Sequence, residues 1–288
     1  MPHISTLIED IYELLGRKDG WFTPELATEF GNELSLKMQT RFAGARKPGL
    51  SLSQMGPRCP KALWHSVHTP ELAEPHPPWA EMKFMYGDVI EALAITLAKA
   101  AGHTVAGEQD VLEVDGVPGH RDCVIDGYVV DVKSCGVYLY ERFKTKSIAE
   151  DDSFGYLDQL DGYLVGSFSD PLVWRKDVAY DWAIDKTLGH MVLYEHHLRE
   201  ERIRDRIRYY KSIVALPKPP TCGCGTKPDG KSGNIKLDTR ASYSSFKQVC
   251  FPLLRAFLYS DGPRYLTKVA RLPDVPEISL RSRSINRA

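Results

Sequence analysis

The stretch VPGHRDCVIDGYVVDVKS, residues 117–134, contains the strongest fold signal in this chain. Two short apolar runs flank the dipeptide Asp126-Gly127, and Asp-Gly in that setting is typical of a two-residue hairpin turn, because a type I′ turn needs positive φ at both central residues. Counting outward from the turn places Asp122 opposite Asp131 on the neighbouring strand. Directly opposed residues in an antiparallel pair point to the same face of the sheet.

That face of the predicted hairpin carries a third charged group. Lys133 lies two residues beyond Asp131 and shares its face, because the side-chain period of a strand is two. Opposed carboxylates repel unless a positive charge lies between them, and a hard divalent cation such as Mg²⁺ suits oxygen ligands at this spacing. A lysine beside such a site can position a water molecule or stabilise charge on a phosphate. A surface hairpin with a solvated cross-strand ion pair is the alternative that the hairpin alone leaves open.

The composition is that of a soluble globular protein. The chain has 288 residues, of which 43% are hydrophobic and 26% charged, with a formal net charge of −1. Any nucleic-acid partner must therefore be met by local patches of charge. The sequence begins without a signal-peptide pattern and has no apolar stretch approaching the roughly 20 residues of a membrane span. We expect a cytoplasmic location, no membrane partner, and six cysteines that serve as thiols or metal ligands rather than disulfides.

Hydrophobic periodicity predicts the elements around the hairpin. We expect helices over 4–17, from Thr23-Pro24 towards 42, and over 61–66, 80–101, 153–166, 196–214 and 253–260. Strands are expected over 104–114, 172–174 and 180–184, with a strand-like or irregular piece over 135–143. The segment 216–233 is too poor in apolar residues to fold through burial.

Four short motifs follow one another along these elements: Gly87-x-x-x-Glu91, Gly119-x-x-Asp122, Asp131-Val132-Lys133 and Gln159-x-x-x-Tyr163. Each alone is common, whereas all four in this order on helix, hairpin and helix are far more specific. The series resembles the PD-(D/E)xK nuclease superfamily, specifically its RecB-like branch, which includes a CRISPR-associated exonuclease and phage relatives. The resemblance covers about residues 51–258.

The resemblance implies an α/β fold with a restriction-endonuclease-like core, in which helices flank a central mixed sheet. We expect an N-terminal helical region over 1–50 and the nuclease core over 51–215. A cysteine-containing segment over 216–270 is then expected to pack back on the core as a metal-bound clamp. The remaining residues, 271–288, are expected to form a flexible basic tail.

The resemblance also assigns catalytic roles to six side chains: Glu91, Asp122, Asp131, Lys133, Gln159 and Tyr163. Asp122 and Asp131 would hold Mg²⁺ or Mn²⁺, with Glu91 and the Val132 carbonyl completing the metal ligands. Lys133 would orient the attacking water, and the Gln159 and Tyr163 pair would support the site and the DNA strand. The residue before Asp122 is Arg121 rather than the eponymous proline, a variation that this branch commonly shows.

The function implied is that of a metal-dependent deoxyribonuclease, more specifically an exonuclease, acting in recombination, repair or phage DNA metabolism. Its partner would be DNA, with linear ends and possibly single strands as substrate, while the oligomeric state stays open. A restriction-type endonuclease and a non-catalytic DNA-binding module on the same fold are the alternatives, because a fold does not determine one function.

The six cysteines divide into two groups. Relatives in this branch often hold a [4Fe–4S] cluster with one cysteine before the core and three after it, and four positions of this chain follow that order: Cys59, Cys222, Cys224 and Cys250. The Cys-x-Cys pair and the 25 residues that separate it from the last cysteine depart from the tighter spacing expected. A structural zinc site would need the same four ligands and is the alternative. Cys123 and Cys135 are expected to be core residues.

Overall fold

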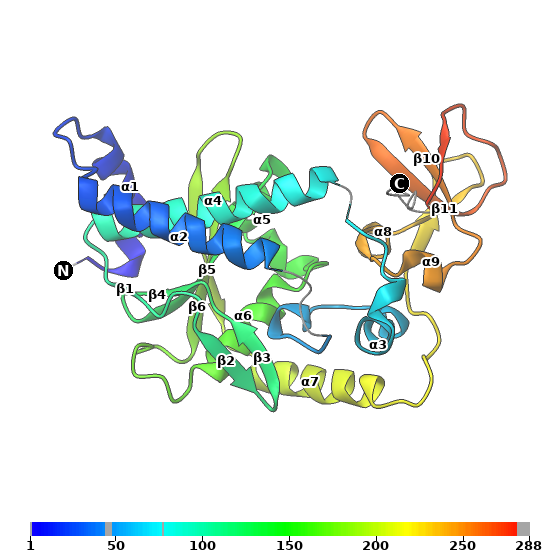
Figure 1. The fold of residues 1–288 in the computed structure, drawn as a ribbon, viewed down its shortest axis with the longest axis horizontal. Helices are drawn as coiled ribbons and strands as arrows, with labels where there is room; N and C mark the ends of the chain where they lie inside the picture. Colours follow the sequence, from blue (N-terminus) through cyan, green and yellow to red (C-terminus); the bar gives the residue numbers. More distant parts are fainter. Residues whose placement is uncertain (1, 44–47, 77, 281–288) are drawn as a thin grey trace. The chain divides into compact units, whose positions relative to one another are not determined.

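The computed structural model describes residues 2–43, 48–76 and 78–280 (Figure 1). The chain divides into two compact units, which are described separately. The first unit comprises residues 1–47, 51–56 and 78–207, and the second comprises 48–50, 57–77 and 208–288. Residues 281–288 of the predicted tail lie outside the described residues, while Glu277–Ile278 forms a short strand, β12.

Within the described residues of the first unit, five strands form a mixed sheet in the order β1-β4-β5-β6-β7. Their bounds are Val105–Ala106, Cys123–Ile125, Tyr128–Cys135, Val178–Asp185 and Met191–His197. Strand β5 runs parallel to β6, and the other pairs are antiparallel. The β4–β5 hairpin has the predicted register, with Ile125 opposite Tyr128, and its turn residues Asp126 and Gly127 have φ values of 50° and 82°.

Helices cover both faces of this sheet. On one face, apolar residues of α1 (Leu7–Gly16) and α4 (Pro78–Ala100) pack against β4, β5 and β6 around the buried Trp182. On the other face, α5 (Val137–Lys144) and α6 (Tyr156–Gly166) pack against β5, β6 and β7. Helix α2 (Pro24–Phe42) runs beside α4, and its N-cap Thr23 accepts a hydrogen bond from the Leu26 amide (Figure 1). The predicted α/β core, a mixed sheet flanked by helices, is confirmed.

Shorter elements complete the first unit. Strands β2 (Val111–Val114) and β3 (Val117–His120) form a separate antiparallel pair, and short 3₁₀ turns occupy Ile4–Thr6, Leu52–Gln54 and Ser147–Glu150. Cys123 and Cys135 are fully buried on opposite faces of the main sheet, so the prediction that they are core residues is confirmed. No helix in the described part of the chain is long and apolar enough to cross a membrane.

The second unit contains an antiparallel sheet in the order β12-β10-β11-β9-β8. The other four strands are Arg255–Tyr259 (β10), Gly262–Lys268 (β11), Ile235–Leu237 (β9) and Thr226–Pro228 (β8). Helices α3 (Pro60–His68), α8 (Thr239–Tyr243) and α9 (Lys247–Cys250) and a 3₁₀ turn at Pro70–Leu72 also belong to it. One of its apolar clusters is small, being built on the buried residues Leu237, Ala241 and Leu254. Helix α7 (Glu200–Val214) has residues in both units.

Four of the predicted elements are wrong in the first unit. Residues 104–114 form two strands rather than one, because Gly107 and Gln109 adopt positive φ between them. Residues 137–144 form helix α5, since Tyr140 and Phe143 are buried one turn apart. Residues 172–174 are a turn, in which the Trp174 amide donates to the Gly127 carbonyl at 2.8 Å. The helix expected from residue 196 begins at 200, because strand β7 occupies the residues before it.

In the second unit, the helix predicted over 253–260 is strand β10. Its Ala256 and Phe257 are both nearly fully buried. A short apolar run of this kind suits either a helix or a buried strand, and pairing with β11 and β12 decides between them.

Candidate active site and cysteine cluster

The six predicted catalytic side chains lie in the first unit, and four of them, Asp131, Lys133, Gln159 and Tyr163, are connected by direct contacts. Glu91 projects from the middle of α4, Asp122 precedes β4, and Asp131 and Lys133 lie on β5, while Gln159 and Tyr163 lie on α6. Lys133 Nζ on β5 donates a hydrogen bond to Gln159 Oε1 on α6 at 3.1 Å. Within α6, Gln159 Nε2 donates to Tyr163 Oη at 2.6 Å.

Asp122 is held at the end of the hairpin where the β4–β5 ladder stops. Its Oδ2 accepts a hydrogen bond from the Val132 amide at 2.8 Å, and its backbone carbonyl accepts one from the Gln109 amide. Burial raises the pKa of Asp122 well above its ordinary value, and the negative charges of Asp131 and Glu91 raise it further. The charged form of this carboxylate therefore needs a nearby cation.

Asp131 and Lys133 form an ion pair on β5. Asp131 is 2% exposed, and its Oδ2 contacts the Lys133 ammonium. Burial alone would lower the pKa of Lys133, but the charges of Asp131, Asp181 and Asp122 raise it above its ordinary value. The ammonium also lies 4.9 Å from the centre of the Tyr156 ring. Lys133 is therefore held charged among the acids.

Asp181 adds a carboxylate that sequence reasoning missed. It lies on β6 directly beside Asp131 in the parallel ladder, is fully buried, and neither of its oxygens has a hydrogen-bond partner. Burial raises its pKa well above the ordinary value, against the opposing charge of Lys133. Because side chains of neighbouring parallel strands at paired positions share a face, the ladder itself brings the two carboxylates together. The alternating pattern around residues 180–184 could have pointed to it.

Glu91 is engaged by two residues that were also missed. Lys37 Nζ contacts Glu91 Oε1 at 2.6 Å, and Gln109 Nε2 donates to the same oxygen at 2.7 Å. Burial raises the pKa of Glu91, and the Lys37 charge opposes that rise. No local pattern marks Lys37, since it lies on α2, 54 positions from Glu91 in the sequence. Only the packing of α2 beside α4 brings it there.

Helix α6, which carries Gln159 and Tyr163, is held in place by a buried ionic network. Asp161 is fully buried and accepts hydrogen bonds from His196 Nε2 at 2.7 Å and from the Arg199 amide and Nε at 2.9 Å each. Burial raises the pKa of Asp161, but His196 and Arg199 outweigh burial and leave the pKa below its ordinary value. Asp158, one turn earlier, accepts from Arg202 Nε at 2.6 Å. These contacts fix α6 to β7 and the first turn of α7.

The donor types at this site suit a divalent cation. The charge of Asp131 raises the pKa of both Glu91 and Asp122, and the charge of Glu91 raises the pKa of Asp122 further. Buried carboxylates are stable when they coordinate a metal or pair with a cation, and oxygen ligands suit Mg²⁺ and Mn²⁺. Their oxygens face Lys37, Lys133 and the Val132 amide in this structure.

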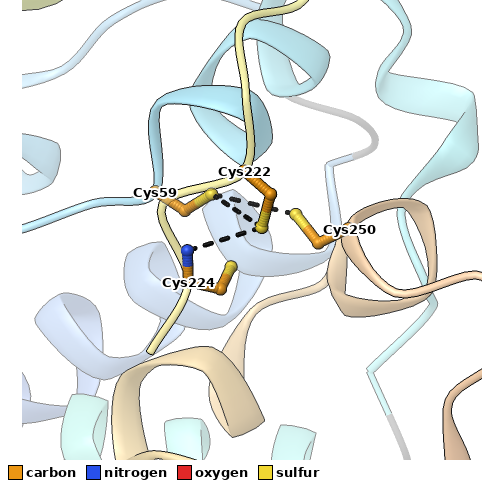
Figure 2. A group of neighbouring side chains, drawn as sticks. All are labelled: Cys59, Cys222, Cys224 and Cys250. Atoms are coloured by element: carbon orange, nitrogen blue, oxygen red, sulfur yellow. Dashed lines mark hydrogen bonds between the residues drawn. The ribbon is translucent and has the colours of Figure 1, made fainter. Parts of the chain in front are cut away.

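The cysteines form a second cluster, in the second unit. Figure 2 shows Cys59 just before α3, Cys222 and Cys224 on the loop that precedes β8, and Cys250 at the end of α9, with their sulfur atoms turned towards one another. Cys59 Sγ lies 3.8 Å from both Cys222 Sγ and Cys250 Sγ. Within the described residues, these four supply the one group of His, Cys, Asp or Glu ligand atoms that all lie within 4.8 Å of one another. The four cysteines can therefore bind a metal or a metal cluster.

Hydrogen bonds within this cluster favour a thiolate at Cys59. Hydrogen bonds from Cys224 and Cys250 lower the pKa of Cys59 far below its ordinary value, while the same contacts raise the pKa of Cys224 and leave that of Cys250 above its ordinary value. The Cys224 amide also donates to Cys222 Sγ at 3.4 Å. Because the thiolate rather than the thiol is the metal ligand, these contacts suit metal binding.

Fold and site together define an α/β protein with a buried site of carboxylates and lysines on its mixed sheet, and with a separate cysteine cluster. No protein-family model matches the sequence, and neither does any curated protein. The comparison with solved structures finds an alkaline exonuclease (LHK-Exo) from Laribacter hongkongensis at a TM-score of 0.37 and 10% identity, covering 62% of this chain and 91% of that one. The structure of SSO0001 matches at a TM-score of 0.39 and 14% identity, covering 80% and 97%. Both likenesses are too distant to support an argument about function.

Proposed function

We propose that this protein is a metal-dependent deoxyribonuclease that hydrolyses phosphodiester bonds. The observation that carries the proposal is the convergence of Glu91, Asp122 and Asp131 beside Lys133, in a buried site on the sheet. The order of these residues along the chain is that of the PD-(D/E)xK series, and the mixed sheet flanked by helices is the architecture expected of a restriction-endonuclease-like core.

The residues suit phosphodiester hydrolysis. A divalent cation held by Glu91, Asp122, Asp131 and the Val132 carbonyl would neutralise charge on the phosphate and lower the pKa of a water molecule. Lys133 is charged and lies between the carboxylates and α6, where its ammonium would orient the attacking water and stabilise negative charge developing on the phosphate.

Gln159 and Tyr163 are proposed to support this arrangement from α6. Gln159 accepts from Lys133 and donates to Tyr163 Oη, so the two side chains hold the ammonium in one position. Burial raises the pKa of Tyr163, and the charges of Asp131 and Asp122 add to that rise, so the phenol stays neutral. A neutral phenol can donate a hydrogen bond to a phosphate oxygen of the bound strand.

Within this class we propose an exonuclease that acts on DNA ends in recombination, repair or phage DNA metabolism. The motif order that resembles the RecB-like branch supports this choice. The test is cleavage of end-labelled linear DNA and of closed circular DNA with Mg²⁺ or Mn²⁺. Wild-type protein is expected to degrade the linear DNA alone, and Asp131→Asn and Lys133→Ala are each expected to lower the rate by about 100-fold or more.

A matched control for Lys133→Ala is Lys144→Ala, which removes an exposed lysine of α5 that pairs with Glu141. The control should cleave at the wild-type rate. Nicking of the circle would replace the exonuclease by a restriction-type endonuclease. Binding of DNA without any cleavage, in a protein whose Mg²⁺ binding is demonstrated, would leave only a non-catalytic DNA-binding module.

A further inference from the structure

The cysteine cluster of the second unit defines the kind of metal centre that it can hold. Its four sulfur atoms lie within 4.8 Å of one another, and two of the distances, from Cys59 to Cys222 and to Cys250, are 3.8 Å. These separations decide between a single ion and a polynuclear cluster, because the two demand different spacings of the same four ligands.

A single tetrahedral ion matches the observed spacing. Zinc–thiolate bonds are about 2.3 Å long, and four sulfur atoms at tetrahedral angles around one such ion are about 3.8 Å apart. The distances from Cys59 to Cys222 and Cys250 have this value. The remaining separations stay below the 4.8 Å bound, so the ligand atoms surround a space of the size of one ion.

A [4Fe–4S] cluster does not fit this spacing. Each thiolate of such a cluster binds a different iron and points outward from a corner of the cube, which separates the sulfur atoms by roughly 6 Å. Every pair of the four sulfur atoms here is closer than that. The iron–sulfur cluster implied by the family resemblance would require all four side chains to move apart.

We infer that Cys59, Cys222, Cys224 and Cys250 bind one tetrahedral Zn²⁺ ion with a structural role. All four positions would be filled by cysteines of the protein, and zinc sites without an open position are structural rather than catalytic. This inference concerns a site different from the proposed nuclease centre and does not depend on that activity.

Such an ion would add to the stability of the second unit. The ligands come from the start of α3, from the loop before β8 and from α9, and Cys59 is separated from Cys222 and Cys250 by 163 and 191 positions. The loop that carries Cys222 and Cys224 has few apolar residues to bury, and the neighbouring core cluster is small. Metal binding provides folding free energy directly where burial is insufficient.

The experiment is elemental analysis and absorption spectroscopy of the full chain, purified without oxygen so that an iron–sulfur cluster would survive. We expect about one zinc per chain, no acid-labile sulfide and no colour. Exchange of zinc for Co²⁺ should give the visible bands of a tetrahedral thiolate site. Iron and sulfide at about four each with broad absorbance near ~400 nm would overturn the inference, as would protein without stoichiometric metal.

Two variants test the ligands. Cys222→Ser is expected to lose zinc, whereas Cys135→Ala, which removes a buried thiol of the first unit, should keep it. Because Cys222→Ser can fail to fold, Cys224→His provides the second measurement. Zinc accepts three cysteines and one histidine, so this variant is expected to retain one zinc per chain. Zinc retention in Cys222→Ser, or its loss in Cys135→Ala, would exclude the assigned ligand set.

Discussion

At the scale of single residues, the candidate active site is a balance of buried charges. Lys133 lies among three carboxylates, those of Asp122, Asp131 and Asp181. Glu91 forms an ion pair with Lys37. Burial raises the pKa of Asp122, Asp181 and Glu91, so each lysine and any bound cation compete to stabilise the same carboxylates. This competition can be tested at Lys37, because its ammonium contacts the carboxylate of the proposed metal ligand Glu91.

We predict that Lys37→Gln tightens binding of Mg²⁺. Loss of the lysine leaves Glu91 without its ion-pair partner and makes the site more negative by one charge. We expect the Mg²⁺ concentration at half-maximal cleavage to fall by about tenfold, which corresponds to about 1.4 kcal/mol. Calorimetric titration of Mg²⁺ in the absence of DNA measures the same change without relying on activity.

The matched control for this prediction is Lys99→Gln. Lys99 lies on α4 and pairs with Glu29 and Glu108 rather than with the site carboxylates. It should leave Mg²⁺ binding unchanged. Equal or weaker Mg²⁺ binding in Lys37→Gln would show that Lys37 supports the ligand Glu91 rather than competing for it.

At the scale of elements, the position of α6 depends on a close backbone approach. Gly155, at the N-cap of α6, has a φ of +79°, and a Cβ built there would lie 2.1 Å from the Gly56 Cα. A residue with a side chain is therefore disfavoured here for two reasons: the positive φ strains its backbone, and its Cβ would collide with the backbone of Gly56. The Asp152 carboxylate accepts three hydrogen bonds from backbone amides at this end of the helix.

We predict that Gly155→Ala displaces α6 and lowers both stability and activity. The free energy of unfolding should fall by about 1–3 kcal/mol or more, because the added methyl group meets backbone that cannot yield. Cleavage should fall as well, since Gln159 one turn later would lose its position beside Lys133. Urea denaturation and the end-labelled DNA assay measure the two effects.

Gly87→Ala is the control for that prediction. Gly87 lies one turn before Glu91 on α4, and a Cβ there would meet nothing within 4 Å. Alanine in the middle of a helix should raise stability by up to about 1 kcal/mol and leave cleavage unchanged. Similar effects of the two substitutions would contradict the steric account of Gly155. The open space at Gly87 also shows that its small size has no steric role in bringing Glu91 to the site.

At the scale of the whole molecule, the chain is made of two units with separate sheets and separate sites. The carboxylates and lysines belong to the first unit, and the four cysteines belong to the second. Each unit has its own apolar cluster, so the metal of the cysteine cluster should stabilise the second unit more than the first.

We predict that removal of this metal exposes the second unit selectively. After treatment with a zinc chelator, amide hydrogens of β10 and β11 are expected to exchange at least tenfold faster, whereas those of β5 and β6 keep their protection. Hydrogen exchange followed by mass spectrometry measures both sheets in one sample. Equal loss of protection in β5 and β6 would show that the two units unfold as one, and unchanged β10 and β11 would show that the metal does not stabilise their sheet.

Features that depend on local pattern can be predicted from the amino-acid sequence. The Asp-Gly turn, the register that places Asp122 near Asp131, and the helix that carries Gln159 and Tyr163 all follow from spacing within a few residues. The order of the four motifs predicts six candidate residues. In the structure, Asp131, Lys133, Gln159 and Tyr163 are linked by direct contacts, and Glu91 and Asp122 lie close enough for their charges to interact with Asp131.

Features that depend on partners distant in the sequence become visible only in the folded chain. Residues 137–144 form a helix where a strand-like or irregular piece was expected, and residues 255–259 form a strand where a helix was expected, because packing partners rather than periodicity selected their conformation. Lys37 lies at the site because α2 packs beside α4, which leaves no local signal. Asp181 lies there because β6 pairs in parallel with β5, and the alternating pattern around residues 180–184 predicts the strand but not that pairing. The spacing of the four sulfur atoms is likewise a property of three segments folded together, and that spacing favours one zinc ion over an iron–sulfur cluster.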